Sequence, residues 1–143
     1  MNSAPKISAL NLKPATRQTA GKILIVDDEP SIVLSLEFLM QNDGYEVAVA
    51  GNGEDALQLA ASFTPHLVLL DVMMPAIDGF EVCRRLRADP AQRGLKILLL
   101  TARGRESEVK RGLTVGADGY VTKPFATREL INKVRELLRE SSN

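Results

Sequence analysis

Apolar residues in this chain of 143 residues recur with two periods, one that predicts buried strands and one that predicts helices. The stretch from His66 to Asp71 shows the first pattern, because four consecutive apolar residues end in one carboxylate and the turn dipeptide Asp78-Gly79 follows. The residues after Pro30 show the second pattern, with apolar positions spaced as on one face of a helix. A strand without polar alternation is typical of a sheet that is covered on both faces.

The same two patterns alternate from residue 22 to the end of the chain. Strands are predicted over Lys22–Val26, Tyr45–Ala50, His66–Asp71, Lys96–Thr101 and Asp118–Thr122. Helices are predicted from Pro30 to Gly44, from the N-cap Asn52 to Thr64, and over about Gly79–Ala88, Arg105–Val115 and Thr127–Arg139. The fourth of these helices has few apolar anchors and contains Gly112, so we expect it to be the least stable.

Five strand–helix units in about 120 residues predict a single three-layer α/β domain with a parallel sheet. The expected fold class is the flavodoxin-like (βα)5 sandwich, with the strands in the order 2-1-3-4-5. An eight-stranded barrel would need about twice the chain. We expect a flexible N-terminal tail over residues 1–21, the domain over residues 22–140, and the C-terminal end over residues 141–143. The alternative for the tail is a segment that docks on a partner or on the protein itself.

Composition and charge exclude several classes of protein. The formal net charge is zero, and four Phe, two Tyr and no Trp leave little for base stacking, so we expect no direct nucleic-acid binding. The one cysteine, Cys83, excludes an internal disulfide, and its place in an apolar helical pattern predicts a core residue. No apolar run approaches about 18 residues and the N-terminus lacks a signal peptide, which predicts a soluble, cytoplasmic protein without membrane contact.

Polar residues stand at the ends of four predicted strands. Asp27 and Asp28 follow the first strand, Asp71 ends the third, Thr101 ends the fourth, and Lys123 follows the fifth. In the expected strand order these four strands are neighbours, and the carboxyl ends of parallel strands meet at one edge of the sheet. We therefore expect three carboxylates, a hydroxyl and an ammonium group in one crevice.

This set of groups favours phosphoryl chemistry with a hard divalent cation. Neighbouring carboxylates repel one another, and oxygen ligands without His or Cys select Mg²⁺ over zinc. A carboxylate such as Asp71 can attack phosphorus and form an aspartyl phosphate. Lys123 can pair with one phosphoryl oxygen, and Thr101 can donate a hydrogen bond to another. The sequence has no glycine-rich phosphate loop, which argues against a bound nucleotide.

Four stretches resemble the marks of the receiver domain of two-component response regulators (the REC, or chemotaxis-regulator-like, domain). They are ILIVDDEP, LVLLDVMMPAIDGFEV, ILLLTA and GADGYVTKPF, in the order and at the spacing of that family. The resemblance implies that Asp71 is the phosphoacceptor and that Asp28 binds Mg²⁺ directly. It also implies that Asp27, Asp71 and the backbone carbonyl of Met73 are further metal ligands.

The resemblance implies roles at the fourth and fifth strands as well. Thr101 and Lys123 would bind phosphoryl oxygens, Tyr120 would be the aromatic switch residue, and the Lys123–Pro124 bond would be cis. The phosphoryl donor would be a sensor histidine kinase or a phosphotransfer protein. The surface of the fourth helix, fifth strand and fifth helix would then change shape, contact a downstream effector and offer a surface for homodimerisation.

Three functions stay open on the sequence alone. The first is a signalling switch that is no enzyme beyond its own phosphorylation from small phosphodonors and its autodephosphorylation. The second is a Mg²⁺-dependent phosphatase or phosphotransferase, which is disfavoured because Met73, two residues past Asp71, is no general acid. The third is an interaction module that works without phosphorylation, in a stand-alone receiver or in part of a longer regulator.

Tyr120 could equally be a partly exposed strand residue, and we expect His66 and Asp118 to be structural.

Overall fold

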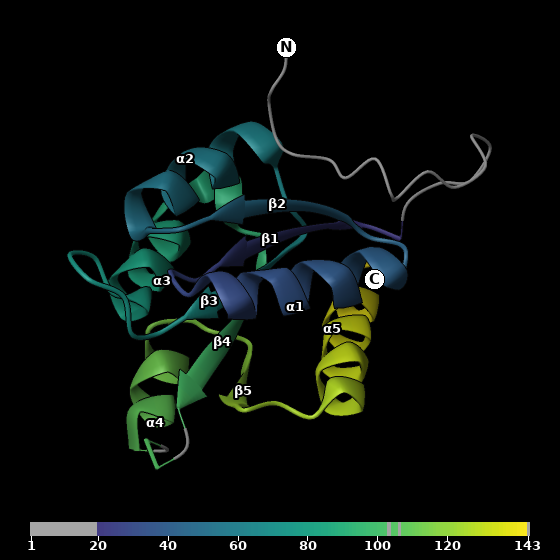
Figure 1. The fold of residues 1–143 in the computed structure, drawn as a ribbon. Coiled ribbons are helices and arrows are strands. Elements are labelled where there is room, and N and C mark those ends of the chain that lie inside the picture. Colours follow the sequence, from purple (N-terminus) through teal and green to yellow (C-terminus); the bar gives the residue numbers. More distant parts are fainter. Residues whose placement is uncertain (1–19, 103, 106, 143) are drawn as a thin grey trace.

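The computed structural model describes residues 20–102, 104–105 and 107–142, which form a parallel sheet with helices on both faces (Figure 1). The strands are β1 (Lys22–Val26), β2 (Glu46–Ala50), β3 (Leu67–Asp71), β4 (Lys96–Ala102) and β5 (Gly119–Lys123). The helices are α1 (Pro30–Asn42), α2 (Gly53–Phe63), α3 (Gly79–Ala88), α4 (Ser107–Thr114), α5 (Thr127–Ser142) and the short 3-10 helix η2 (Pro90–Gln92). The strands lie in the order β2-β1-β3-β4-β5, which confirms the predicted fold class.

Successive side chains of each strand point to opposite faces of the sheet and pack into two separate hydrophobic cores. Ile23 and Ile25 of β1 pack with the residues of α1 and α5 that face the sheet. Leu24 and Val26 of the same strand pack with α2 and α3 on the opposite face, where α4 also lies (Figure 1). Because both faces are covered, every residue of β3 is buried, as its unbroken apolar run predicts.

Side-chain caps begin two of the helices, and the sequence predicted the first of them. The side chain of Asn52 accepts a hydrogen bond of 2.8 Å from the N–H of Asp55, which confirms the predicted start of α2. Asp78 accepts one of 2.9 Å from the N–H of Glu81, so this residue of the turn dipeptide is also the N-cap of α3. The helix after β3 therefore begins within a few residues of the carboxylate that ends the strand.

The main departures from the predicted elements concern α4, η2 and the end of α5, which extends to Ser142 rather than to Arg139. The fourth helix is shorter than expected at both ends. Arg105 lies before it, and its N–H donates to the carbonyl of Ala102. The 3-10 helix was not predicted. It forms because Asp89 caps the N–H of Ala91 and Pro90 occupies its first position.

Cys83 and His66 have structural roles, as expected. Cys83 is fully buried, and burial raises the pKa of its thiol to about 11. His66 accepts a hydrogen bond of 2.9 Å from the N–H of Lys22 through Nδ1 and so joins the starts of β1 and β3.

Two further expectations concern the ends of the chain and the membrane. Most of the predicted tail, residues 1–19, lies outside the described residues. Among the helices that the structure describes, none is long and apolar enough to cross a membrane.

Candidate functional site

Strand register brings the three predicted acids together. β1 and β3 pair in parallel with Val26 opposite Leu70, so Asp27 and Asp71 leave the sheet side by side. One carboxylate oxygen from each of Asp27, Asp28 and Asp71 lies within 4.8 Å of the other two. Asp27 and Asp71 are only 1% and 5% exposed, whereas Asp28 is exposed to solvent. The site is thus a buried pair of carboxylates with a third at its mouth.

Lys123 is the cation of this acidic pocket. β5 pairs with β4 so that Lys123 lies opposite Ala102, at the same edge of the sheet as the acids. Its Nζ lies 2.8 Å from Oδ2 of Asp27 and 3.3 Å from Oδ1 of Asp71. Burial opposes the charged form of Lys123, but the nearby carboxylates of Asp27 and Asp71 outweigh it and raise the pKa of the ammonium group.

One oxygen of Asp27 is short of a donor. Oδ1 accepts a hydrogen bond of 3.0 Å from the N–H of Glu29. Oδ2 is buried and has no donor in hydrogen-bond geometry among the described residues, although the ammonium of Lys123 lies close to it. A buried carboxylate oxygen of this kind is suited to a cation.

The carboxyl group of Asp71 has a raised pKa. Burial, and then the charge of Asp27, raise the pKa of Asp71 from 3.8 to about 6, while Lys123 and the N–H of Met73 act in the opposite direction. Burial and the charge of Asp27 together therefore exceed what the ammonium group of Lys123 offsets. The acids Asp27, Asp28 and Asp71 are consistent with a metal site, because a divalent cation would supply the missing positive charge.

Thr101 lies at the same edge but is turned to a different partner. The register of β3 and β4 sets Asp71 opposite Leu100, so Thr101 is one residue further along its strand. It is 3% exposed, and its hydroxyl donates a hydrogen bond of 3.2 Å to the carbonyl of Ala102. The structure thus brings Thr101 to the pocket without a hydrogen bond to the acids among the described residues.

The remaining predicted site residues border the pocket. The N–H of Met73 donates a hydrogen bond of 3.3 Å to Oδ1 of Asp71, and the side chain of Met73 is exposed. Tyr120 lies on β5 with 40% of its surface exposed. The Lys123–Pro124 peptide bond is cis. The roles of Met73 as a metal ligand and of Tyr120 as a switch residue stay predictions.

Gly79 is a residue of the site that sequence reasoning took only as a turn signal. Its N–H donates a hydrogen bond of 2.9 Å to the carbonyl of Val72, and a Cβ at this position would collide with the carbonyl oxygen of Asp71. Only glycine lets α3 begin so close to the end of β3. A turn dipeptide in the sequence does not indicate this contact, because it depends on the angle at which α3 leaves the strand.

Fold and pocket together define a class of protein. It is a parallel α/β domain with strand order 2-1-3-4-5, in which acids after β1 and β3 face a lysine of β5. Residues 23–135 match the family model of the response regulator receiver domain. The chain belongs to this family, which confirms the resemblance seen in its four sequence stretches, and it is the receiver domain of a two-component response regulator.

Known proteins of this family align with most of the chain. It is 47% identical over 120 residues to the alkaline phosphatase synthesis transcriptional regulatory protein PhoP of Bacillus subtilis, across 84% of this chain and 49% of that protein. It is 43% identical over 122 residues to the DNA-binding response regulator MtrA of Mycolicibacterium smegmatis, across 85% of this chain and 52% of that protein. The chain thus spans about half the length of these curated relatives.

A solved structure of similar length shows the same fold. The chemotaxis response regulator CheY4 of Vibrio cholerae superposes with a TM-score of 0.78 at 33% sequence identity. The match covers 83% of this chain and 99% of that one. The similarity therefore extends over the whole of a receiver and not over one motif.

Proposed function

We propose that the protein is a phosphorylation-activated signalling switch whose Asp71 accepts a phosphoryl group from a sensor histidine kinase or a phosphotransfer protein. The observation that supports this most is the meeting of Asp27, Asp28, Asp71 and Lys123 at one edge of the sheet. A nucleophilic carboxylate, a set of metal-binding oxygens and a fixed positive charge are the groups that phosphoryl transfer to an aspartate needs.

The acids of the pocket fit Mg²⁺. All candidate ligands are oxygens, Oδ2 of Asp27 is buried with the ammonium of Lys123 close to it, and the three carboxylates of the described pocket face this one ammonium group. Asp28, Asp27, Asp71 and the backbone carbonyl of Met73 would hold the ion. When bound, it supplies positive charge that offsets the repulsion between Asp71 and the phosphoryl oxygens.

Asp71 is the nucleophile of the transfer. One of its carboxylate oxygens forms a bond to phosphorus while the bond from phosphorus to the donor's histidine nitrogen breaks. That nitrogen keeps the electron pair and takes up a proton. Lys123, already 3.3 Å from Asp71, pairs with one phosphoryl oxygen, and the hydroxyl of Thr101 turns from the carbonyl of Ala102 to another.

This rotation of the Thr101 side chain couples the pocket to the surface formed by α4, β5 and α5. It leaves space into which Tyr120, which is 40% exposed, can rotate. In α4 only Val109 and Gly112 are buried, so this helix is weakly anchored and suited to move. The altered α4-β5-α5 surface then contacts a downstream effector or a second copy of the domain.

We assign the receiver domain to residues 22–140, between a tail of residues 1–21 and the C-terminal residues 141–143.

Phosphorylation by a small donor tests the proposal without knowledge of the kinase. Incubation with acetyl phosphate and Mg²⁺ should add the mass of one phosphoryl group to the wild-type protein, and none to Asp71→Asn. An adduct that persists in Asp71→Asn, or continuous turnover of unrelated phosphomonoesters, would contradict the switch. Equal affinity of wild type and Asp71→Asn for an effector would instead support an interaction module that needs no phosphorylation.

A further inference from the structure

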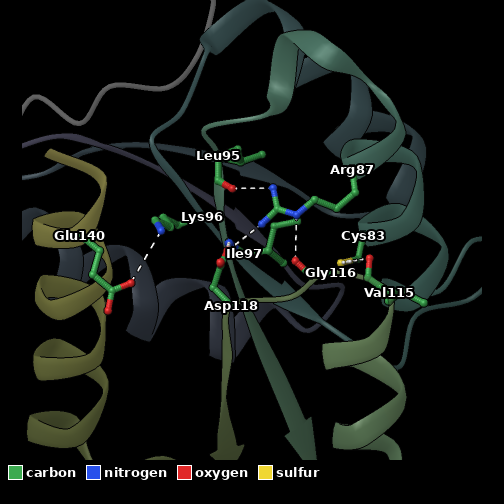
Figure 2. Close-up of polar contacts among 9 residues, drawn as sticks. All are labelled: Cys83, Arg87, Leu95, Lys96, Ile97, Val115, Gly116, Asp118 and Glu140. Atoms are coloured by element: carbon green, nitrogen blue, oxygen red, sulfur yellow. Dashed lines mark hydrogen bonds and ion pairs between the residues drawn. The ribbon is translucent and has the colours of Figure 1, made fainter. Parts of the chain in front are cut away.

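Arg87, at the C-terminal end of α3, binds three separate acceptors at the edge of the sheet opposite Asp71. Its Nε donates to the carbonyl of Gly116 at 2.8 Å and its Nη1 to the carbonyl of Leu95 at 2.7 Å. Its Nη2 forms an ion pair of 2.7 Å with Oδ2 of Asp118 (Figure 2). One guanidinium group thus joins the end of α3 to the residue before β4 and to the connection between α4 and β5.

Asp118 extends the pairing of β4 and β5 beyond the strands themselves. Its backbone N–H donates to the carbonyl of Ile97 at 2.8 Å, and its side-chain Oδ2 accepts from the N–H of Ile97 at 2.8 Å. The carboxylate of Asp118 therefore accepts the kind of hydrogen bond that a backbone carbonyl of a paired strand would accept. Asp118 is therefore structural, as expected, and its partners in this role are Ile97 and Arg87. Figure 2 shows Asp118 and Ile97 facing one another at the starts of the two strands.

The pairing of β5 needs such a restraint. β5 lies at the end of the sheet order, with β4 as its neighbour, and Val121 is its one buried residue. Register is specified weakly in a strand that buries so few side chains, and a slip of one residue would turn every side chain to the other face. Lys123, at the far end of this strand, depends on the register for its place beside Asp27 and Asp71.

We propose that Arg87 and Asp118 are positioning residues that anchor the start of β5 and thereby hold Lys123 in reach of Asp71. They act at a distance, because five residues of strand at about 3.3 Å each separate Asp118 from Lys123 by roughly 16 Å. Gly116 completes the anchor, since a Cβ at this position would lie 2.6 Å from Cγ of Arg87. The inference rests on the proposed function, because it concerns how Lys123 serves phosphorylation of Asp71.

A double-mutant cycle between Arg87 and Lys123 tests this inference. The readout is the initial rate of Asp71 phosphorylation by acetyl phosphate at saturating Mg²⁺, measured by intact mass. We expect Arg87→Met to lower this rate about threefold to tenfold. In the Lys123→Met background the same substitution should have no further effect, since the group that it displaces is absent. Loss of stability alone would reduce the rate in both backgrounds by the same factor and would overturn the inference.

Two further variants separate the anchor from charge and from general damage to α3. Arg85→Met is the matched control, because Glu81 on the same helix is the one partner of Arg85 among the described residues, and its rate should equal that of wild type. Arg87→Lys keeps the charge but cannot reach three acceptors, so its rate should stay close to that of Arg87→Met. Full activity of Arg87→Lys would overturn the inference.

Amide hydrogen exchange checks the anchor itself. The N–H groups of Ile97 and Asp118 should exchange faster in Arg87→Met than in wild type. Mg²⁺ should raise the melting temperature of both proteins, as expected if the acidic pocket is folded in each. Unchanged exchange at both amides would contradict the anchor. If the wild-type protein gains no phosphoryl group, the proposed function fails and the inference with it. If wild type is phosphorylated but Arg87→Met changes the phosphorylation rate by the same factor with and without Lys123, the inference alone fails.

Discussion

Replacing Asp71 by Asn should stabilise the metal-free protein above about pH 6. Burial and the carboxylate of Asp27 raise the pKa of Asp71 from 3.8 to about 6, in spite of Lys123 and the N–H of Met73. A rise of about two pKa units corresponds to roughly 3 kcal/mol that the ionised group costs the folded state. An Asn side chain has a similar shape and never ionises, so it removes this cost.

The pH dependence of this effect has a definite sign. The folded protein keeps the proton of Asp71 up to about pH 6, whereas the unfolded chain releases it near pH 3.8. Asp71 therefore costs no stability below the unfolded pKa, and its full cost is present above the folded pKa. The two proteins should converge in stability toward pH 4. At pH 8 the variant should be up to about 3 kcal/mol more stable, or up to roughly 12 °C higher in melting temperature for a domain of about 120 residues.

Thermal unfolding followed by circular dichroism between pH 4 and pH 8, in EDTA, measures this difference. Glu54→Gln is the control, because it removes an exposed carboxylate outside the pocket and should change the melting temperature little at any pH. Mg²⁺ should then stabilise wild type more than Asp71→Asn and narrow the gap at pH 8. A variant less stable than wild type at pH 8 in EDTA, or a gap that does not change with pH, would refute the reasoning.

Three other substitutions probe the pocket. Lys123→Met removes the only ammonium group within reach of the buried acids in the described structure. Mg²⁺ should then raise the melting temperature more than in wild type, because more negative charge is left for it to offset. A smaller rise would contradict this balance of charges in the pocket. Asp28→Asn should abolish most of that rise without unfolding the protein, because Asp28 is exposed; an unchanged rise would remove Asp28 from the metal site. Gly79→Ala should cost about 1–3 kcal/mol in chemical denaturation, since its Cβ would collide with the carbonyl of Asp71. Gly94→Ala, where a Cβ meets nothing within 4 Å, should be near neutral, and equal effects at both glycines would contradict the packing at Gly79.

The acidic pocket was predictable because it depends on few facts. Once the pattern of apolar residues indicated five parallel strands, the carboxyl ends of neighbouring strands had to meet at one edge. Asp27, Asp71 and Lys123 occupy such ends, and the observed registers bring them within ion-pair distance. The cap at Asn52 was predictable for a similar reason, since it uses only residues close in sequence.

The details that were not predictable depend on contacts between distant elements. Arg84, Arg85 and Arg87 look alike in the sequence, but the first two pair with Glu81 on their own helix. Only the way α3 packs beside the start of β4 gives Arg87 its three acceptors. The present partner of the Thr101 hydroxyl is likewise a rotamer choice, which residue type and spacing do not determine.

The central claim is that Asp71, Thr101 and Lys123 act on one phosphoryl group beside a divalent ion. A crystal structure of the protein with Mg²⁺ and beryllofluoride, a mimic of the phosphoryl group, tests it most directly. We expect beryllium bonded to a carboxylate oxygen of Asp71, the ion bound by Asp27 and Asp28, and fluorides in hydrogen-bond reach of the Thr101 hydroxyl and of Lys123 Nζ. A Thr101 hydroxyl still bonded to the carbonyl of Ala102, or a Lys123 directed away from the fluorides, would contradict the claim.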